Sequence, residues 1–203
     1  MTLAGGRQAV GLLVALAFLP GVATAQSLDP TMVTDAPPHV RALGSVVLVG
    51  LCGGLVLALR RTLVDRAVDD TMGDPFRAVF YGLGAYVFAC FLGLFASTFL
   101  LQLGVGRTPL GAVVTVALLG GVALLSGLGY AVFGTLLTDL YGVRRPWAGL
   151  LVGSAISAVC WLVAPVLPAF AAWVLVAAFG VGGPARTWVH SERTVASERA
   201  TRE

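Results

Sequence analysis

The chain is a succession of long apolar stretches separated by short polar segments. A membrane-spanning helix needs about 20 apolar residues at a rise of about 1.5 Å each. Stretches without a charged residue predict spans at about 43–59, 78–103, 109–137, 147–164 and 166–183. The pattern therefore predicts an all-α, polytopic helical membrane bundle of five transmembrane helices after an N-terminal signal sequence, with residues 43–183 as the helical membrane domain.

Two prolines separate the last two spans. Residues 147–183 form a stretch of 37 residues without a charge. One helix of that length would measure about 55 Å, well beyond the roughly 30 Å hydrocarbon core of a bilayer. Pro165 and Pro168 lie at its middle, where proline removes backbone donors and breaks a helix. We therefore predict a hairpin of two helices here.

The N-terminal segment has the organisation of a secretory signal peptide. Arg7 precedes an apolar stretch at 9–19, and Ala23-Thr24-Ala25 supplies a small-residue cleavage motif. We expect residues 1–25 to be removed as a signal peptide, with an uncleaved first span as the alternative. Residues 26–42 contain several Asp and Pro residues and are expected to form an extracytoplasmic tether.

Composition agrees with a membrane protein. The chain is 58% hydrophobic and only 11% charged, whereas soluble domains are about a quarter charged. The same values exclude intrinsic disorder, which requires few apolar residues. All basic residues are Arg, and they lie in separate loops rather than in one basic stripe, so no nucleic-acid partner is expected.

The positions of the arginines predict the orientation. Short cytoplasmic loops of membrane proteins are enriched in Lys and Arg. With five spans, ten arginines fall on one side and only Arg41 and Arg107 on the other. We therefore expect a multi-pass protein of the cell (plasma) membrane, with its N-terminus outside after cleavage. Residues 184–203 then form an Arg-rich cytoplasmic tail.

The loop from Arg60 to Arg77 predicts an amphipathic helix at 61–72. Its apolar residues, such as Leu63 and Val64, recur at helical spacing opposite charged ones, so the helix is expected to lie along the inner membrane surface. Arg61/Asp65 and Arg66/Asp70 are spaced for i,i+4 ion pairs. Asp74 and Pro75 are suited to cap and begin the next helix. The expected cytoplasmic surface consists of Arg60, Arg61, Arg66, Arg144, Arg145 and Arg186.

Small residues at four-residue spacing predict where helices pack, because helices in lipid associate through close backbone approach. The candidate packing positions are Gly50, Gly54, Ala85, Ala89, Gly93, Ser97, Gly149, Gly153 and Ser157. They fit packing inside one bundle, with contacts in a homo-oligomer as the alternative. The glycines of the third span, including Gly127, Gly129 and Gly134, are expected to weaken that helix and to favour a bend.

No pattern of residues indicates catalysis, a metal or a cofactor. The spans carry no ionisable Asp, Glu, Arg or His, Cys52, Cys90 and Cys160 fall in different spans, and the two histidines fall on opposite sides of the predicted membrane. We therefore expect neither an enzyme nor a bound cofactor. The hydroxyls available for a polar path are Ser97, Thr98, Thr115, Ser126, Thr135, Ser154 and Ser157.

Several short motifs from about residue 60 onward carry a family resemblance. They are Asp74-Pro75-Phe76-Arg77-Ala78, Thr108-Pro109-Leu110-Gly111, Gly129-Tyr130, Phe133-Gly134, Arg145-Pro146-Trp147, the Pro165–Pro168 turn and Gly180-Val181-Gly182-Gly183. In these motifs, about two thirds of the chain resembles the membrane region found with bactofilin-like polymer-forming cytoskeletal proteins of halophilic archaea. The resemblance implies an archaeal membrane anchor or scaffold associated with cell shape or the envelope.

The expected function is thus that of a non-enzymatic anchor or scaffold for cytoskeletal or envelope components. Its expected partners are the lipid bilayer and either a cytoplasmic protein or further copies of itself. The alternative is a small passive transporter or channel subunit for a neutral solute.

Overall fold

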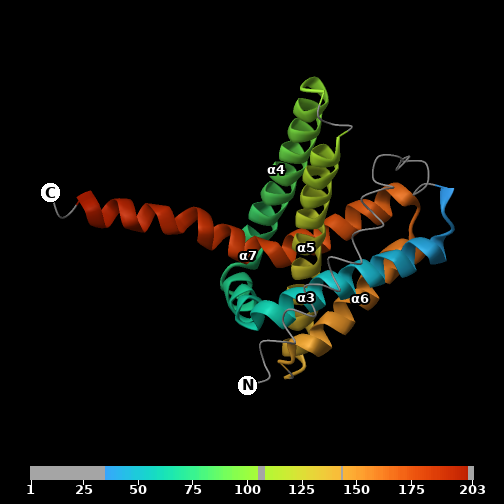
Figure 1. Cartoon of the computed structure of the whole chain (residues 1–203). Helices are drawn as coiled ribbons and strands as arrows, with labels where there is room; N and C mark the ends of the chain where they lie inside the picture. Colours follow the sequence, from blue (N-terminus) through green and yellow to red (C-terminus); the bar gives the residue numbers. More distant parts are fainter. Residues whose placement is uncertain (1–34, 105–107, 143, 201–203) are drawn as a thin grey trace, which may run out of the picture.

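The computed structural model describes residues 35–104, 108–142 and 144–200. Every regular element in these ranges is a helix (Figure 1). The elements are α3 (Pro38–Gly73), α4 (Pro75–Gln102), α5 (Pro109–Leu140), α6 (Pro146–Val163) and α7 (Val166–Ala200). The predicted signal peptide at 1–25 lies outside the described residues, as does the predicted tether up to residue 34.

Five of the described helices are long and apolar enough to cross a membrane, which confirms the predicted number. The break between α6 and α7 falls at Ala164 and Pro165, the first of the two prolines, and Pro168 lies in the first turn of α7. Residues 38–42, assigned to an extended tether from sequence, instead form the first turn of α3. Pro38 permits this, because proline at the first helical position lacks only a donor that has no partner there.

Proline begins four of the five described helices, namely α3, α4, α5 and α6. Asp74 caps α4 as expected, since its carboxylate accepts a hydrogen bond from the backbone N–H of Arg77 at 3.3 Å. Thr108 caps α5 in the same way through the N–H of Gly111. Local sequence therefore fixes where these helices start.

α3 consists of two helical parts joined at Arg60. This residue has φ −147° and ψ 67°, outside the helical region. The apolar part before it is a candidate span, and residues 61–73 after it form the charged part, called here the α3 elbow helix. The bend redirects the elbow helix toward α7, so the two parts of α3 contact different neighbours.

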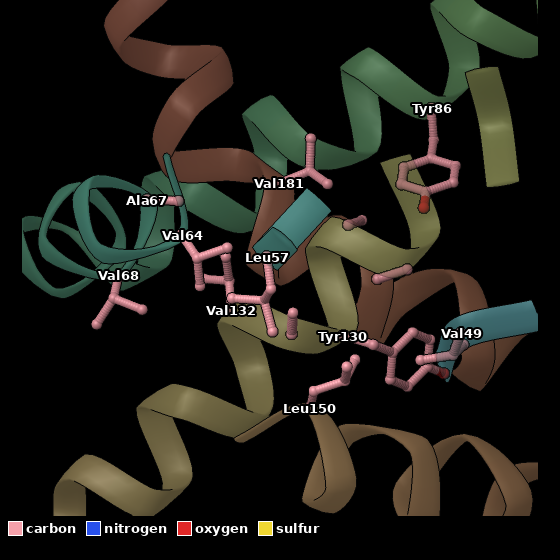
Figure 2. Close-up of a cluster of buried hydrophobic side chains, with 13 residues drawn as sticks. Val49, Leu57, Val64, Ala67, Val68, Tyr86, Tyr130, Val132, Leu150 and Val181 are labelled. Carbon is pink, nitrogen blue, oxygen red and sulfur yellow. The ribbon is translucent and has the colours of Figure 1, made fainter. Parts of the chain in front are cut away.

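The main core gathers side chains from all five helices (Figure 2). Val49, Leu57 and Val64 of α3 pack near Tyr130 and Val132 of α5, with Leu150 of α6 and Val181 of α7 alongside. Tyr86 is the contribution of α4. The cluster therefore joins all five described helices into one bundle.

Glycine and alanine form the closest helix crossings. A methyl group added to Gly82 of α4 would overlap the carbonyl of Ala178 of α7, and one added to Gly129 of α5 would overlap that of Ala177. On the other side of α5, Gly134 meets the backbone of Gly149 of α6. Backbones approach this closely only where no side chain separates them.

The outer halves of α4 and α5 extend away from this core as a hairpin (Figure 1). Most large side chains of α4 beyond Tyr86 are exposed, including Phe88, Phe91, Phe95 and Phe99. The rings of Phe91, Phe95 and Phe99 stack on one another at centroid distances of 6.4 and 6.2 Å. An apolar surface of this kind fits contact with lipid chains.

Candidate interaction surface at the charged end

The charged end of the bundle comprises the α3 elbow helix, the start of α4, the α5–α6 loop at 141–145 and the part of α7 after Gly183. The elbow helix packs against the rest of the protein through a buried face, in which Val64, Ala67 and Val68 are at most 1% exposed. This corrects the expectation that the whole apolar face of the helix lies on the membrane surface. Leu63 and Met72 remain outside, at 43% and 44% exposure.

A close helix crossing explains why the elbow helix docks on protein. A Cβ atom at Gly183 of α7 would stand 2.7 Å from the backbone nitrogen of Thr71 and 3.0 Å from the carbonyl oxygen of Ala67. The Thr71 hydroxyl donates to that same carbonyl at 2.7 Å, so burial leaves it satisfied. The neighbouring Gly182 meets Ala78 at the start of α4. Two adjacent glycines of α7 thus allow both the elbow helix and α4 to pack closely against it.

Arg144 ties the α5–α6 loop to the elbow helix. Its Nη2 donates to the Asp69 carboxylate at 2.8 Å and to the Asp65 carbonyl at 2.9 Å. The hydrogen bond to Asp69, together with the charges of Asp69, Asp139 and Asp65, raises the pKa of Arg144 above its usual value, against a smaller opposing effect of burial. Arg144 is therefore a fixed positive charge at this contact.

Arg186 ties α7 to the junction of α3 and α4. Its Nη2 donates to the Asp70 carbonyl at 3.2 Å, and its Nη1 lies 3.8 Å from the Asp74 carboxylate. Asp74 also pairs with Arg77 at 3.2 Å while capping α4. One carboxylate therefore links α4 and α7 at the end of the elbow helix.

The ion pairs predicted within the elbow helix are wrong. Among the described residues, Asp69 of this helix pairs instead with the distant Arg144, whereas Asp65 and Asp70 accept arginine hydrogen bonds at their backbone carbonyls. The bend at Arg60 brings Asp69 to the α5–α6 loop, and sequence spacing cannot reveal a partner 75 residues away. Of the six arginines predicted to form an open surface, Arg144 and Arg186 are used internally. Arg144 is nevertheless exposed at its surface, and the other four, Arg60, Arg61, Arg66 and Arg145, are called here the exposed arginines.

Exposed aromatic residues lie at the same end of the bundle as these arginines. Phe76 is 80% exposed and Tyr141 86% exposed. A shallow cavity of about 240 Å³ is bordered by the elbow helix, α5 and α7. It is lined by Leu63, Arg66, Ala67, Asp70, Leu128, Pro184 and Thr187. The charged end thus offers basic and apolar groups together, as interfacial surfaces do.

The predicted packing residues divide into two groups. Gly149 and Gly153 of α6 lie in close contact with Thr135 and Tyr130 of α5, whereas Gly50 and Gly54 of α3 face α6 more loosely. Ser157 is fully buried. On α4, Ala85 and Ala89 are half-buried, and Gly93 has no atom within 4 Å of where its Cβ would stand. The side chain of Ser97 lies outside the described set.

Sequence reasoning missed several contact glycines. Gly53 meets Gly127 and Leu150, and Gly182 and Gly183 meet α4 and α3. Gly127, Gly129 and Gly134 were expected to favour a bend, but α5 is one helix and these residues lie at its crossings with α3, α7 and α6. Four-residue spacing alone does not distinguish a glycine at a crossing from one facing lipid.

The polar groups inside the bundle form short, closed hydrogen-bond chains. Trp173 Nε1 donates to Ser157 Oγ at 3.0 Å, Ser157 donates to Ser45 at 2.9 Å, and Ser45 donates to the Ala42 carbonyl. The other hydroxyls described from the candidate polar path each donate to a carbonyl four residues earlier in their own helix. These are Thr98, Thr115, Ser126, Thr135 and Ser154. Local pairing of this kind satisfies the hydroxyls without linking them into a path.

The described residues contain no group of three or more His, Cys, Asp or Glu side chains placed to hold a metal ion. Comparison of the chain with protein-family models, with curated proteins and with solved structures finds no match.

Proposed function

We propose that this protein is a non-enzymatic anchor or scaffold of the plasma membrane, with its charged end in the cytoplasm and its N-terminus outside. The observation that carries the proposal is the form of α7. The middle of this helix, around Ala177 and Val181, is buried in the bundle, and the helix continues as one element to Ala200, so that its last third projects away from the other helices (Figure 1). Residues 188–200 form this projecting arm.

The arm has a fixed base, which suits a docking element. Gly182 and Gly183 pack against α4 and the elbow helix, and Arg186 is held at Asp70 and Asp74. An arm of 13 helical residues reaches about 20 Å beyond that base. Because the helix is held at one end, its free part keeps a defined direction and is accessible to a soluble partner.

The exposed arginines support the proposed orientation and a role in membrane contact. Arg60, Arg61, Arg66 and Arg145 lie at the end of the bundle that carries exposed Phe76 and Tyr141. An arginine near an anionic leaflet contributes about 1 kcal/mol of attraction. We propose that they hold the charged end at the headgroups while the arm binds a protein of cell shape or the envelope, the class that the bactofilin-like resemblance implies.

The test is to end the chain after Thr187, which removes the arm and retains Arg186. We expect this variant to unfold at the same temperature as the full chain but to lose a stoichiometric cytoplasmic protein that co-purifies with it. A chain whose residues 188–203 are replaced by a Gly-Ser linker of equal length is the matched control and should also lose that partner. An unchanged set of partners in both variants would refute the role of the arm.

A further inference from the structure

A second cavity lies at the other end of α3, beside the turn between α6 and α7. Its volume is about 480 Å³, within the range of about 300–1,000 Å³ typical of ligand sites. The lining residues are Ala36, Val40, Arg41, Gly44, Ser45, Leu48, Trp161, Phe170 and Trp173. Apart from Arg41 and Ser45, these residues present mostly carbon atoms to the cavity.

Arg41 brings hydrogen-bond donors without a described partner to this apolar wall. Its Nε and Nη1 atoms are buried and have no hydrogen-bond partner among the described residues. The guanidinium carbon lies 5.7 Å from the centre of the Trp161 ring, a cation–π contact that leaves the N–H groups unused. Buried donors without a partner are costly, so a turn of the Arg41 side chain that brings these nitrogens to the cavity would let an acceptor of a ligand pair with them.

Trp161 supplies a second, independent donor. The residue is only 8% exposed, and its Nε1 also has no partner within the described part of the chain. The other polar groups of the wall are already paired, because Trp173 donates to Ser157 and Ser45 donates to Ala42. The unused groups are therefore donors, contributed by Arg41 and Trp161.

Within the described residues, the wall has hydrogen-bond donors to spare but no acceptors to spare. It therefore favours a ligand group that only accepts hydrogen bonds. An ionised carboxylate or phosphate is such a group, and a guanidinium binds either through two parallel N–H donors. A neutral alcohol headgroup would bring a hydrogen-bond donor of its own, and the wall offers few free acceptors for it. Val40, Leu48 and Phe170 provide partly exposed apolar surface beside the donors, where an acyl chain can lie.

We propose that this cavity binds an anionic amphiphile, with its carboxylate or phosphate at Arg41 and Trp161 and its chain along Leu48 and Phe170. The site is independent of the proposed docking arm, because it lies at the opposite end of α3. Gly44 lines the cavity and has open space beyond its Cα atom, which gives the ligand chain room.

The experiment uses the full chain in phosphatidylcholine nanodiscs, with Trp147→Phe and Trp188→Phe so that Trp161 and Trp173 are the reporters. Bromine-labelled stearate is titrated against bromine-labelled stearyl alcohol, which partitions into the bilayer without a charge. We expect the acid to quench tryptophan fluorescence saturably and the alcohol only in proportion to its concentration. Bromine-labelled phosphatidic acid, run in parallel, shows whether carboxylate or phosphate is preferred.

Three variants test separately how the charge of Arg41, the donor of Trp161 and the open space at Gly44 contribute to binding. Arg41→Gln should weaken stearate binding by about tenfold or more, and Trp161→Phe by less, as expected for charged and neutral hydrogen bonds. Gly44→Leu should block binding while retaining the charge. Arg77→Gln, which removes an exposed arginine at the start of α4, far from the cavity, should leave binding unchanged.

Three results would overturn the proposal, and the first two need no change to the residues that line the cavity. The first is equal quenching by acid and alcohol in the unmodified pocket. The second is displacement of stearate by inorganic phosphate alone, which would indicate a site for small anions. The third is stearate binding that appears only after Asp29→Asn with Asp35→Asn, which would mean that the chain's own carboxylate fills the cavity.

Discussion

At the scale of single residues, the absence of side chains is as important as their presence. α7 crosses three neighbours through Ala177, Ala178, Gly180, Gly182 and Gly183, and nearly all of these contacts are backbone against backbone. In lipid, close packing replaces the hydrophobic effect as the force between helices. A single added methyl group at such a crossing therefore acts directly on the separation of two helices.

Gly182→Ala is predicted to destabilise the bundle by about 1–3 kcal/mol, the usual cost of overpacking. The new methyl group would overlap the Ala78 carbonyl of α4. Thermal unfolding in detergent measures the effect. Gly93→Ala is the matched control, because nothing stands near that position. It should be neutral or stabilise by up to about 1 kcal/mol through higher helix propensity. Equal effects of the two variants would show that the α4–α7 crossing is not this close.

Ser157→Ala is predicted to destabilise the protein by about 1 kcal/mol, within the range for hydrogen bonds between membrane helices. The change removes the acceptor of Trp173 Nε1 and the donor to Ser45, which join α7, α6 and α3. Ser154→Ala is the control, since its hydroxyl donates only to Leu150 of its own helix. Chemical or thermal unfolding of the two variants should rank Ser157 above Ser154. The reverse order would refute the bridging role.

At the scale of elements, local sequence decides where helices begin and tertiary contacts decide what they touch. The starts of α4 and α5 follow from Asp74-Pro75 and Thr108-Pro109, which can be recognised in the sequence. The docking of the elbow helix cannot be recognised in the sequence, because its amphipathic pattern suits a protein surface as well as a lipid surface. Its partners, Gly183 and Arg144, lie far away along the chain.

Arg144→Gln is predicted to loosen the elbow helix. Loss of the bonds to Asp69 and Asp65 should speed amide hydrogen exchange at 61–73, while the change in global stability stays below about 1 kcal/mol, as for other exposed ion pairs. Arg145→Gln, one residue along, should leave exchange there unaltered. If Asp69→Asn added to Arg144→Gln speeds exchange further by its full separate effect, the two side chains are not coupled.

At the scale of the whole molecule, packing is uneven. α3, α5, α6 and α7 surround one core, whereas the outer half of α4 exposes a row of phenylalanines. The number of helices could be predicted from apolar length and from Pro165 and Pro168. The uneven packing could not, because the small residues of α4, such as Ala89 and Gly93, have the same spacing as those of α6 that do form contacts.

The central claim is that five spans place the charged end on one side of the membrane and the α6–α7 turn on the other. The most direct test is labelling of single cysteines in a background without Cys52, Cys90 and Cys160. Met72, Tyr141 and Leu167 are suitable sites, because their side chains are 44%, 86% and 84% exposed. An impermeant maleimide added to intact cells should label Leu167→Cys, whereas Met72→Cys and Tyr141→Cys should react only after the membrane is opened. Labelling of Leu167→Cys and Tyr141→Cys from the same side would contradict the account.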